Sequence, residues 1–176
     1  ALFHYSATGV ALGSIAEGGA VSVSVDPVDG SVWAAFGDGE VRHYTPQGTV
    51  LWAGDGFVAA AAVSVDEGDG SCWIADEGGN EVIHLAATGA EIARTGGFSQ
   101  PKCVSANPAD GSCWVADYYN NRIVHLAADG SLLWQGRTFS LPQAIGVDTW
   151  DGSCWVADTG RNAVAPDVRG RSRRSR

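Results

Sequence analysis

The sequence predicts an all-β protein built from repeated four-stranded antiparallel sheets. The first observation is a motif that returns every 40 or 41 residues, as DGSVWAAF at 29–36, DGSCWIAD at 69–76 and DGSCWVAD at 110–117 and 151–158. The second is that Asp-Gly turn signals separate short β-rich runs, with no helical periodicity between them. A period of this length is typical of an array of equivalent structural units.

The repeat extends beyond this motif, because several residue types recur in the same register. All four histidines of the chain occupy one repeat position, and phenylalanine and aspartate or asparagine form further series. The series are Trp33, Trp73, Trp114 and Trp155; His4, His43, His84 and His125; Phe57, Phe98 and Phe139; and Asp26, Asp66, Asn107 and Asp148. The chain therefore contains copies of one unit.

One repeat reads as a meander of four strands. Between Pro101 and Gly136 the β-rich runs are CVSAN, SCWVAD, RIVHLA and SLLWQG, and DG pairs occupy two of the turns between them. Aspartate and glycine suit these turns because they tolerate the positive φ that tight hairpins require. The run SCWVAD is apolar on both faces until its final aspartate, so its sheet must be covered on both sides. Radial stacking of small sheets provides that cover, which favours a β-propeller over a sandwich.

Two segments resemble the NHL repeat. They are NPADGSCWVADYYNNRIVHL at 107–126 and LPQAIGVDTWDGSCWVADTGRN at 141–162, which carry its apolar strand, DG turn, V-A-D element and N-x-(R/H)-(I/V) element. The resemblance extends from about Leu2 to Asn162 and implies the propeller fold. It leaves function open, because the family includes protein-binding modules, RNA-binding modules, lyases and bacterial proteins of unknown role. It favours a secreted or periplasmic location.

The register at the two ends predicts complementary half-blades. Residues 2–5 align with 41–44, so the chain begins at the third strand of a blade, whereas 146–158 supplies a first and a second strand. After Asn162 the pattern fails, and Pro166 stands at the histidine position. The expected organisation is a propeller over 1–165, with a half-blade at 1–19, blades at 20–58, 59–99 and 100–140, and a half-blade at 141–165, followed by a basic disordered tail at 166–176.

Joining the two half-blades would remove two exposed strand edges, which otherwise invite aggregation. Joining within one chain gives four blades, joining head to tail between two chains gives a ring of eight, and failure to close gives a polymer. Both closed forms lie within the known range, and the wedge angle typical of the resembling family slightly favours the dimer over the closed monomer. The chain is alternatively a fragment of a longer array or an engineered one.

Charge and composition restrict the partners. The net charge is −9, and residues 1–168 carry all 20 acidic groups but only 6 of the 11 basic ones. We expect this acidic body to repel nucleic acid, and we interpret the arginine-rich tail as a disordered terminus. No apolar run approaches the roughly 18 residues of a membrane span.

The cysteines and histidines are interpreted as structural residues. Cys72, Cys113 and Cys154 are the same residue of successive repeats, and stacked sheets lie about 10 Å apart, which is too far for a disulfide. Cys103 occupies a slot that holds small residues in other copies, so all four cysteines are expected to be buried thiols. The histidines fall in the third strand, too far from the ring centre to share a metal.

The candidate binding residues lie at strand ends and loops. Each second strand ends in aspartate, and the loop that follows varies between copies, which is where recognition residues are expected on a rigid scaffold. The predicted ligand-binding set on this loop face is Tyr118, Tyr119, Asn120, Asn121, Arg122, Asp76, Asp117 and Asp158. For the aspartates, fixing the loop is the competing role, and for Tyr118 it is covering the neighbouring blade.

A metal in the central channel is a weaker candidate. Carboxylates and an amide end the innermost strands at Asp26, Asp66, Asn107 and Asp148, and a ring of such oxygens suits calcium. Turn capping is the competing role, and no other cofactor is expected.

The sequence shows no catalytic motif and no set of residues that breaks the repeat symmetry. It therefore favours a non-enzymatic scaffold or binding module that interacts with a protein, peptide or glycan or assembles with itself. The alternative is a propeller lyase or hydrolase with a metal in the channel.

Overall fold

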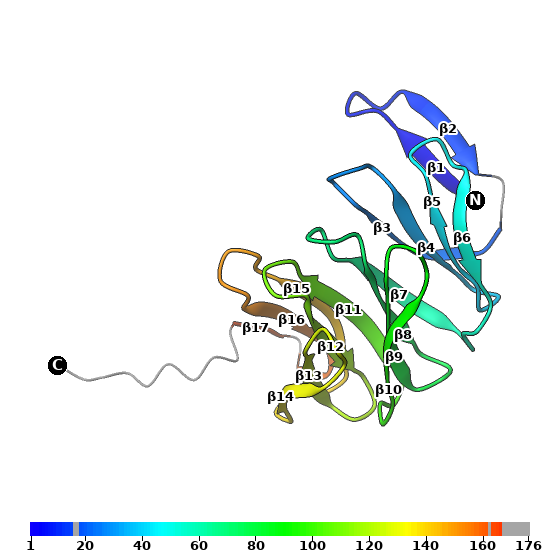
Figure 1. Cartoon of the computed structure of the whole chain (residues 1–176). Coiled ribbons are helices and arrows are strands. Elements are labelled where there is room, and N and C mark those ends of the chain that lie inside the picture. Colours follow the sequence, from blue (N-terminus) through cyan, green and yellow to red (C-terminus); the bar gives the residue numbers. More distant parts are fainter. Residues whose placement is uncertain (16–17, 162, 167–176) are drawn as a thin grey trace.

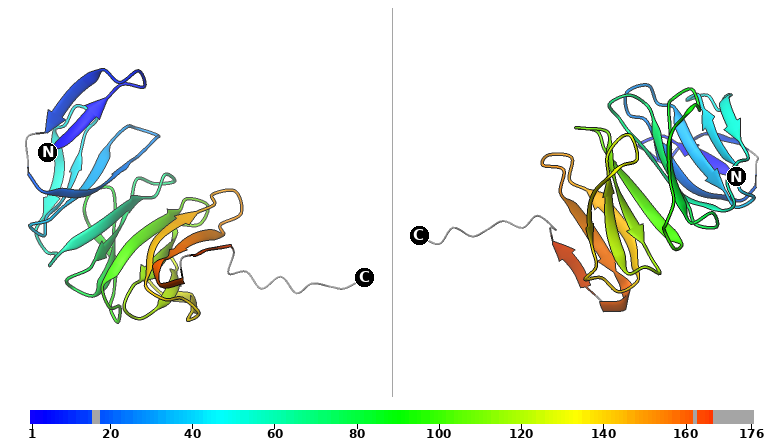
Figure 2. Two further views of the ribbon diagram at one scale, coloured as in Figure 1. Left: turned by 180° about the vertical axis from the view of Figure 1, so that it is seen from behind. Right: turned by 60° about the horizontal axis from the view of Figure 1, so that its bottom comes forward.

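A computed structural model describes residues 1–15, 18–161 and 163–166 of the chain. This described part contains strands β1 to β17 and one short 3₁₀ turn, η1 (Thr159–Arg161). Figure 1 and Figure 2 show small sheets stacked face to face along an open arc, with the N-terminal strands at one end and the C-terminal strands at the other. No long apolar helix that could cross a membrane occurs in these residues.

Three sheets have four antiparallel strands each, in sequential order. The first blade contains β3 (Ala20–Val25), β4 (Val32–Phe36), β5 (Val41–Tyr44) and β6 (Val50–Gly54). The second blade contains β7 (Ala60–Val65), β8 (Cys72–Asp76), β9 (Glu81–Leu85) and β10 (Glu91–Thr95). The third blade contains β11 (Pro101–Asn107), β12 (Ser112–Asp117), β13 (Arg122–Leu126) and β14 (Leu132–Gly136). The four-stranded antiparallel unit predicted from the repeat is confirmed.

Both faces of these blades are covered, as the apolar second strands predicted. Trp73 and Ile74 follow one another on β8 and point to opposite faces, yet both are fully buried. Trp73 packs against the third blade and Ile74 against the first. The first strands β3, β7 and β11 contact one another in succession, so they form the inner side of the arc.

The turns follow the chemistry that the Asp-Gly pairs predicted. In the turn of the third blade, Gly111 has a φ of +71°, and the Asp110 Oδ1 atom accepts a hydrogen bond from the Ser112 N–H at 3.1 Å. A side chain at position 111 would be strained in this left-handed conformation. The same carboxylate-to-amide bond recurs from Asp29 to Ser31 and from Asp69 to Ser71.

The N-terminal hairpin contains β1 (Leu2–Tyr5) and β2 (Ala11–Ile15), and it has the register of a third and a fourth strand. Its register shifts between His4 and Tyr5, as the pairing of β5 with β6 shifts between His43 and Tyr44. The hairpin packs on the first blade, where Leu2 and Ile15 cover part of the outer half. The two strands form a sheet of their own beside the first blade.

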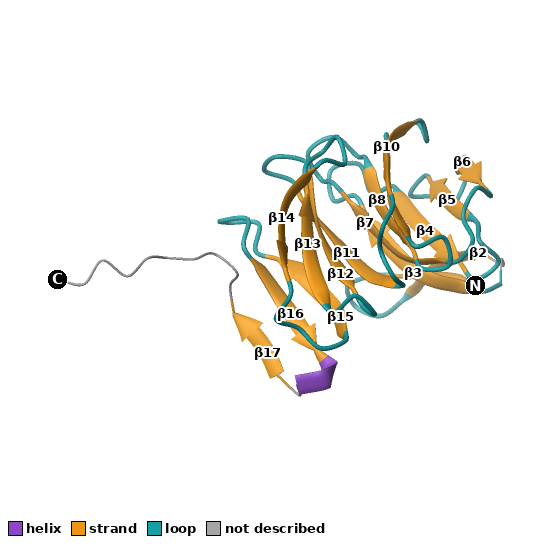
Figure 3. Ribbon diagram, turned by 90° about the horizontal axis from the view of Figure 1, so that it is seen from below, coloured by secondary structure: helices purple, strands orange, loops and turns teal. Residues whose placement is uncertain are grey.

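The C-terminal sheet contains β15 (Pro142–Val147), β16 (Cys154–Asp158) and β17 (Ala163–Pro166). The expectation that this sheet lacks both outer strands is wrong for the third strand, because β17 pairs with β16. Backbone hydrogen bonding needs no particular side chains, so a segment without the repeat sequence can still fill a strand position. Figure 3 shows β17 beside η1, the only helical turn in the part of the chain that is described. The basic tail predicted at 166–176 lies outside the described residues after Pro166.

Candidate functional site

A tryptophan on the second strand and a histidine on the third strand stack in each complete blade. The ring centroids lie 4.2 Å apart for Trp33 and His43, 4.0 Å for Trp73 and His84, and 4.1 Å for Trp114 and His125. The planes deviate from parallel by 8° or less. His43, His84 and His125 thus pack within their blades, each on a tryptophan of the neighbouring strand.

Each stack also connects its blade to the next one. The Trp73 Nε1–H donates to the Gly111 carbonyl at 3.2 Å, and the His84 ring meets the Ala128 carbonyl through Nδ1 at 2.8 Å. The other ring nitrogen, Nε2, lies 2.8 Å from the Ser71 hydroxyl within the same sheet. Trp33 and Trp114 make the matching bonds to Gly70 and Gly152. The stack therefore fixes the orientation of consecutive blades.

The two ends of the arc each hold half of this stack. Trp155 on β16 is 53% exposed, whereas Trp33, Trp73 and Trp114 are at most 5% exposed. The backbone register places Pro166 opposite Trp155, where a complete blade has histidine. At the other end, His4 occupies the histidine position of the N-terminal hairpin and is exposed.

The inner half of the first blade also lacks the cover that the other blades have. Val23 on β3 is 54% exposed, whereas the equivalent residues Val63, Val104 and Ile145 are 9% exposed or less. In those blades the residue packs against the tryptophan-bearing face of the preceding blade. A hollow of about 370 Å³ lies between the N-terminal hairpin and the first blade, with Val23 and Val25 in its wall. In the other blades, the equivalent apolar side chains are buried against the preceding blade, whereas on this surface they are exposed.

The aspartates that end the second strands are buried and fix the loops between blades. Asp76 accepts hydrogen bonds from the Val58 and Ala59 N–H groups at 2.9 and 2.8 Å, and it is fully buried. Asp117 accepts from the Ser99 N–H at 2.7 Å, and Asp158 accepts from the Ser140 N–H at 2.8 Å. The structure thus places these three predicted binding residues beneath the loop face, in the role of loop fixation.

Arg122, Asn120 and Asn121 are also engaged within the protein. Arg122 pairs with Asp117 at 2.6 Å through Nε and donates to the Gly97 carbonyl through its NH2 nitrogen at 2.8 Å. Asn120 donates to the Asp117 carboxylate, and the side-chain oxygen of Asn121 accepts from the Leu141 N–H. These contacts satisfy the groups that an external ligand would need.

The two tyrosines of the predicted loop set lie against each other. Tyr118 and Tyr119 form an edge-to-face pair with centroids 4.9 Å apart, and Tyr119 is 55% exposed. The Lys102 ammonium lies 5.6 Å from the Tyr118 ring centroid.

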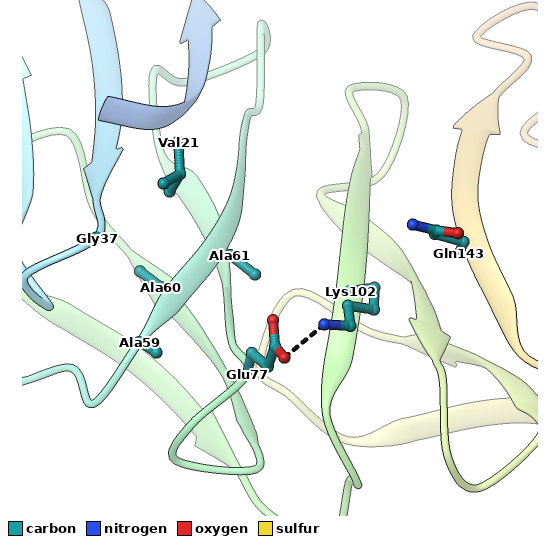
Figure 4. A pocket seen from close by; sticks show the side chains of 8 residues that line it. All are labelled: Val21, Gly37, Ala59, Ala60, Ala61, Glu77, Lys102 and Gln143. Atoms are coloured by element: carbon teal, nitrogen blue, oxygen red, sulfur yellow. Dashed lines mark hydrogen bonds and ion pairs between the residues drawn. The ribbon is translucent and has the colours of Figure 1, made fainter. Parts of the chain in front are cut away.

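Lys102 belongs to a group that the sequence analysis missed. Figure 4 shows Lys102 paired with Glu77, with Ala61 and Gln143 on either side. These residues line a hollow of about 380 Å³ on the inner side of the arc. One repeat position holds Val21, Ala61, Lys102 and Gln143, and it differs in every copy. This position varies although the residues around it repeat from copy to copy. That contrast was the signal in the sequence that could have identified the group.

The residues proposed for a channel metal act as turn caps. The Asp26 Oδ1 atom accepts from the Val28 N–H at 2.8 Å, and the Asp66 Oδ1 atom accepts from the Gly68 N–H at 2.8 Å. Asn107 and Asp148 cap the equivalent turns. Burial raises the pKa of Asp66, although the bond from Gly68 opposes that shift. In the described ranges no three histidine, cysteine or acidic side chains are grouped so as to hold a metal ion.

None of the four cysteines forms a disulfide within the described residues, and three of them are buried. Burial raises the pKa of Cys72, Cys103 and Cys113. These thiols are poor metal ligands and poor nucleophiles at neutral pH, because only the thiolate reacts.

No protein-family model and no curated protein sequence matches the chain. Solved structures do resemble it in fold. A streptogramin B lyase structure superposes with a TM-score of 0.71 at 17% identity over 87% of this chain and 52% of that one.

Two further structures agree with this likeness. The structure of U3-55K gives a TM-score of 0.67 at 10% identity, covering 84% of this chain and 51% of that one. A nidogen/laminin complex gives 0.64 at 16% identity, covering 79% and 56%. The chain thus spans about half the length of the solved structures it resembles. The likeness shows a β-propeller type of fold and does not single out the NHL repeat within it.

Proposed function

We propose that this chain is a non-enzymatic β-propeller scaffold that completes its ring by binding a second copy of itself head to tail. The N-terminal hairpin of one copy supplies the third and fourth strands for the C-terminal sheet of the other. The observation that carries the proposal is the divided stack, in which Trp155 and His4 are both exposed at opposite ends of the arc.

The proposed contact would supply three things that the ends of the arc lack: a ring partner for Trp155, an acceptor for its N–H and a cover for the exposed valines. Trp155 would stack on His4 of the second copy, and its Nε1–H would meet the carbonyl of Gly30, which aligns with Gly70 and Gly111. The face of β16 that carries Trp155 would cover Val23 and Val25 of the same partner copy. Burial of each large apolar side chain stabilises such a contact by about 1.5–3 kcal/mol.

One feature of the complete interfaces is missing from this contact. Between complete blades the Ser64 hydroxyl accepts from the Ala106 N–H, and the Ser105 hydroxyl accepts from the Val147 N–H. The aligned residue on β15 is Gly146, which has no hydroxyl. The proposed interface therefore depends on the aromatic stack and apolar burial more than on this bond.

The shape of the arc supports closure with a second copy more than closure within one chain. The N-terminal hairpin and the C-terminal sheet lie at opposite ends of the arc, so the two halves do not meet in one chain (Figure 2). Three blades from each copy and two shared blades would give a ring of eight.

The ring would present the tyrosine pair to a protein, peptide or glycan. Exposed tyrosine next to a cation is common in recognition surfaces, and Tyr118, Tyr119 and Lys102 supply both near the inner hollow. A peptide and glycan array probed with the wild type and with Tyr119→Ala tests this part. Binding that the variant loses supports recognition by the pair, and equal binding by both contradicts it.

Light scattering over a wide concentration range tests the assembly. We expect twice the chain mass of 18.2 kDa for the wild type, and the mass of one chain for Trp155→Glu and for His4→Glu. Ile92→Glu is the matched control, because Ile92 is 47% exposed on β10, the outer strand of the middle blade. A single-chain mass for the wild type at every concentration, or an unchanged dimer for Trp155→Glu, would contradict the proposal.

A further inference from the structure

The edge of β16 that the second copy would need is already occupied by β17. The four backbone pairs of β16 with β17 have the register of a second and a third strand, with Trp155 opposite Pro166 as Trp114 is opposite His125. In the N-terminal hairpin, β1 also has third-strand register, and its outer edge pairs with β2. The inner edge of β1 and the segment β17 therefore compete for one edge of β16.

β17 is a poorer third strand than β1. Pro166 has no backbone N–H, so at the position opposite Trp155 the outer edge of β17 has no donor for a fourth strand. No fourth strand flanks β17 among the described residues, whereas β1 brings β2 with it. Trp155 also stays 53% exposed with β17 in place.

We propose that β17 is a placeholder strand that covers the edge of β16 until the β1 strand of a second copy displaces it. This inference rests on the head-to-tail assembly proposed above and adds its mechanism. In a single copy, β17 satisfies the backbone groups of β16, which would otherwise offer an open edge to other chains. Assembly replaces four backbone pairs with an equivalent set and gains the stack of His4 on Trp155.

The direct test compares the full chain with variants that cannot form β17. Ala165→Pro removes the N–H of β17 that faces Val156 on β16 and leaves β1 to β16 intact, and a chain that ends at Gly160 removes the strand. Because neither variant must displace a strand, we expect both to dimerise with a dissociation constant lower by roughly tenfold or more. Sedimentation equilibrium gives the constants, and circular dichroism checks that each variant is folded.

Hydrogen exchange gives a second measurement on the unaltered chain. Amides of β17 should be protected at low concentration and exchange freely once the dimer forms, while amides of β1 should change in the opposite direction. Trp155→Glu should keep β17 protected at all concentrations, because it cannot gain the stack.

The outcomes separate the two proposals. If the full chain and both variants dimerise with equal affinity and β17 stays protected, the placeholder role is wrong and the head-to-tail assembly stands. If the full chain and both variants stay monomeric, the assembly is wrong and the placeholder role falls with it. Tighter association of the variants together with loss of β17 protection in the wild-type dimer supports both.

Discussion

Trp114 and His125 lie with their ring centroids 4.1 Å apart and their planes 3° from parallel. The tryptophan reaches the Gly152 carbonyl of the next sheet, and the histidine meets the Ser112 hydroxyl of its own sheet. This pair thus links the strands of one blade and the blade to its neighbour. The complete blades contain both rings of this pair. Each end of the arc contains only one of them, the tryptophan at one end and the histidine at the other.

Truncation of a central tryptophan should be severe. Trp73 is fully buried between the second and third blades and stacks on His84, so Trp73→Ala should lower the free energy of unfolding by about 3–5 kcal/mol. Urea denaturation measures the change. Trp150→Ala, at a residue that is 95% exposed, should have an effect below about 0.5 kcal/mol. Similar losses for both variants would contradict the proposed role of the stack.

Removal of a buried loop aspartate should lower the free energy of unfolding more than removal of an acidic residue on the surface. Asp117 is fully buried and holds both Arg122 and the Ser99 N–H, so Asp117→Ala leaves a cation and a donor without their acceptor. We expect a loss of about 3 kcal/mol in the free energy of unfolding. Glu91→Ala, which breaks an exposed pair with Arg94, should cost less than about 1 kcal/mol. Equal costs in urea denaturation would refute the structural role of Asp117.

Stability should fall as the solution becomes acidic, in part because of His43. Burial lowers the pKa of His43 below its usual 6.5, although the Ala87 carbonyl and nearby Asp29 and Asp26 oppose the shift. Below pH 6.5 the unfolded chain therefore binds a proton that the folded chain refuses, and this contribution to stability is lost as pH falls toward the folded pKa. Above pH 6.5 it is fully present.

The measurement is the melting temperature of the wild type and of His43→Gln between neutral and mildly acidic pH. The variant should show the smaller dependence on pH across the window just below 6.5, because glutamine does not titrate. Both proteins are measured at a concentration at which they are single chains, so that dimerisation does not contribute to the slope. A wild-type slope that survives in His43→Gln would exclude this histidine as its cause.

The cysteines should react with thiol reagents only slowly in the folded protein. Cys72, Cys113 and Cys154 are at most 2% exposed, and burial raises the pKa of the first two. Cys103 is partly exposed, so we expect it to be labelled first. Ellman's reagent should titrate all four thiols quickly in urea. Fast reaction of three or more thiols in the native chain would contradict the close packing between blades.

Much of the fold follows from local patterns in the sequence. The second strand ending in Asp117 and the turn at Asp110-Gly111 depend on residues a few positions apart, so a repeat alone predicts them. The third-strand histidines were predicted to be structural because their strand lies far from the inner side of the arc. Their stacking partner was not predicted, because Trp114 and His125 meet only when β12 and β13 pair.

The candidate site was less predictable. Of the loop set, the sequence could not distinguish the exposed Tyr119 from Arg122, whose charge is taken up by Asp117 within the protein. The inner hollow at Lys102 also went unnoticed, because the residues around it come from separate repeats.

By itself, the sequence determined the repeating unit and its strand order, since these properties depend on periodic side chains. The tertiary structure alone decided which matching residues are buried and which are exposed, as for Val63 and Val23. It also decided that β17 takes the third-strand place beside β16. The physical reason is that burial depends on the neighbouring sheet, and that an open strand edge pairs through its backbone with whatever segment lies within reach.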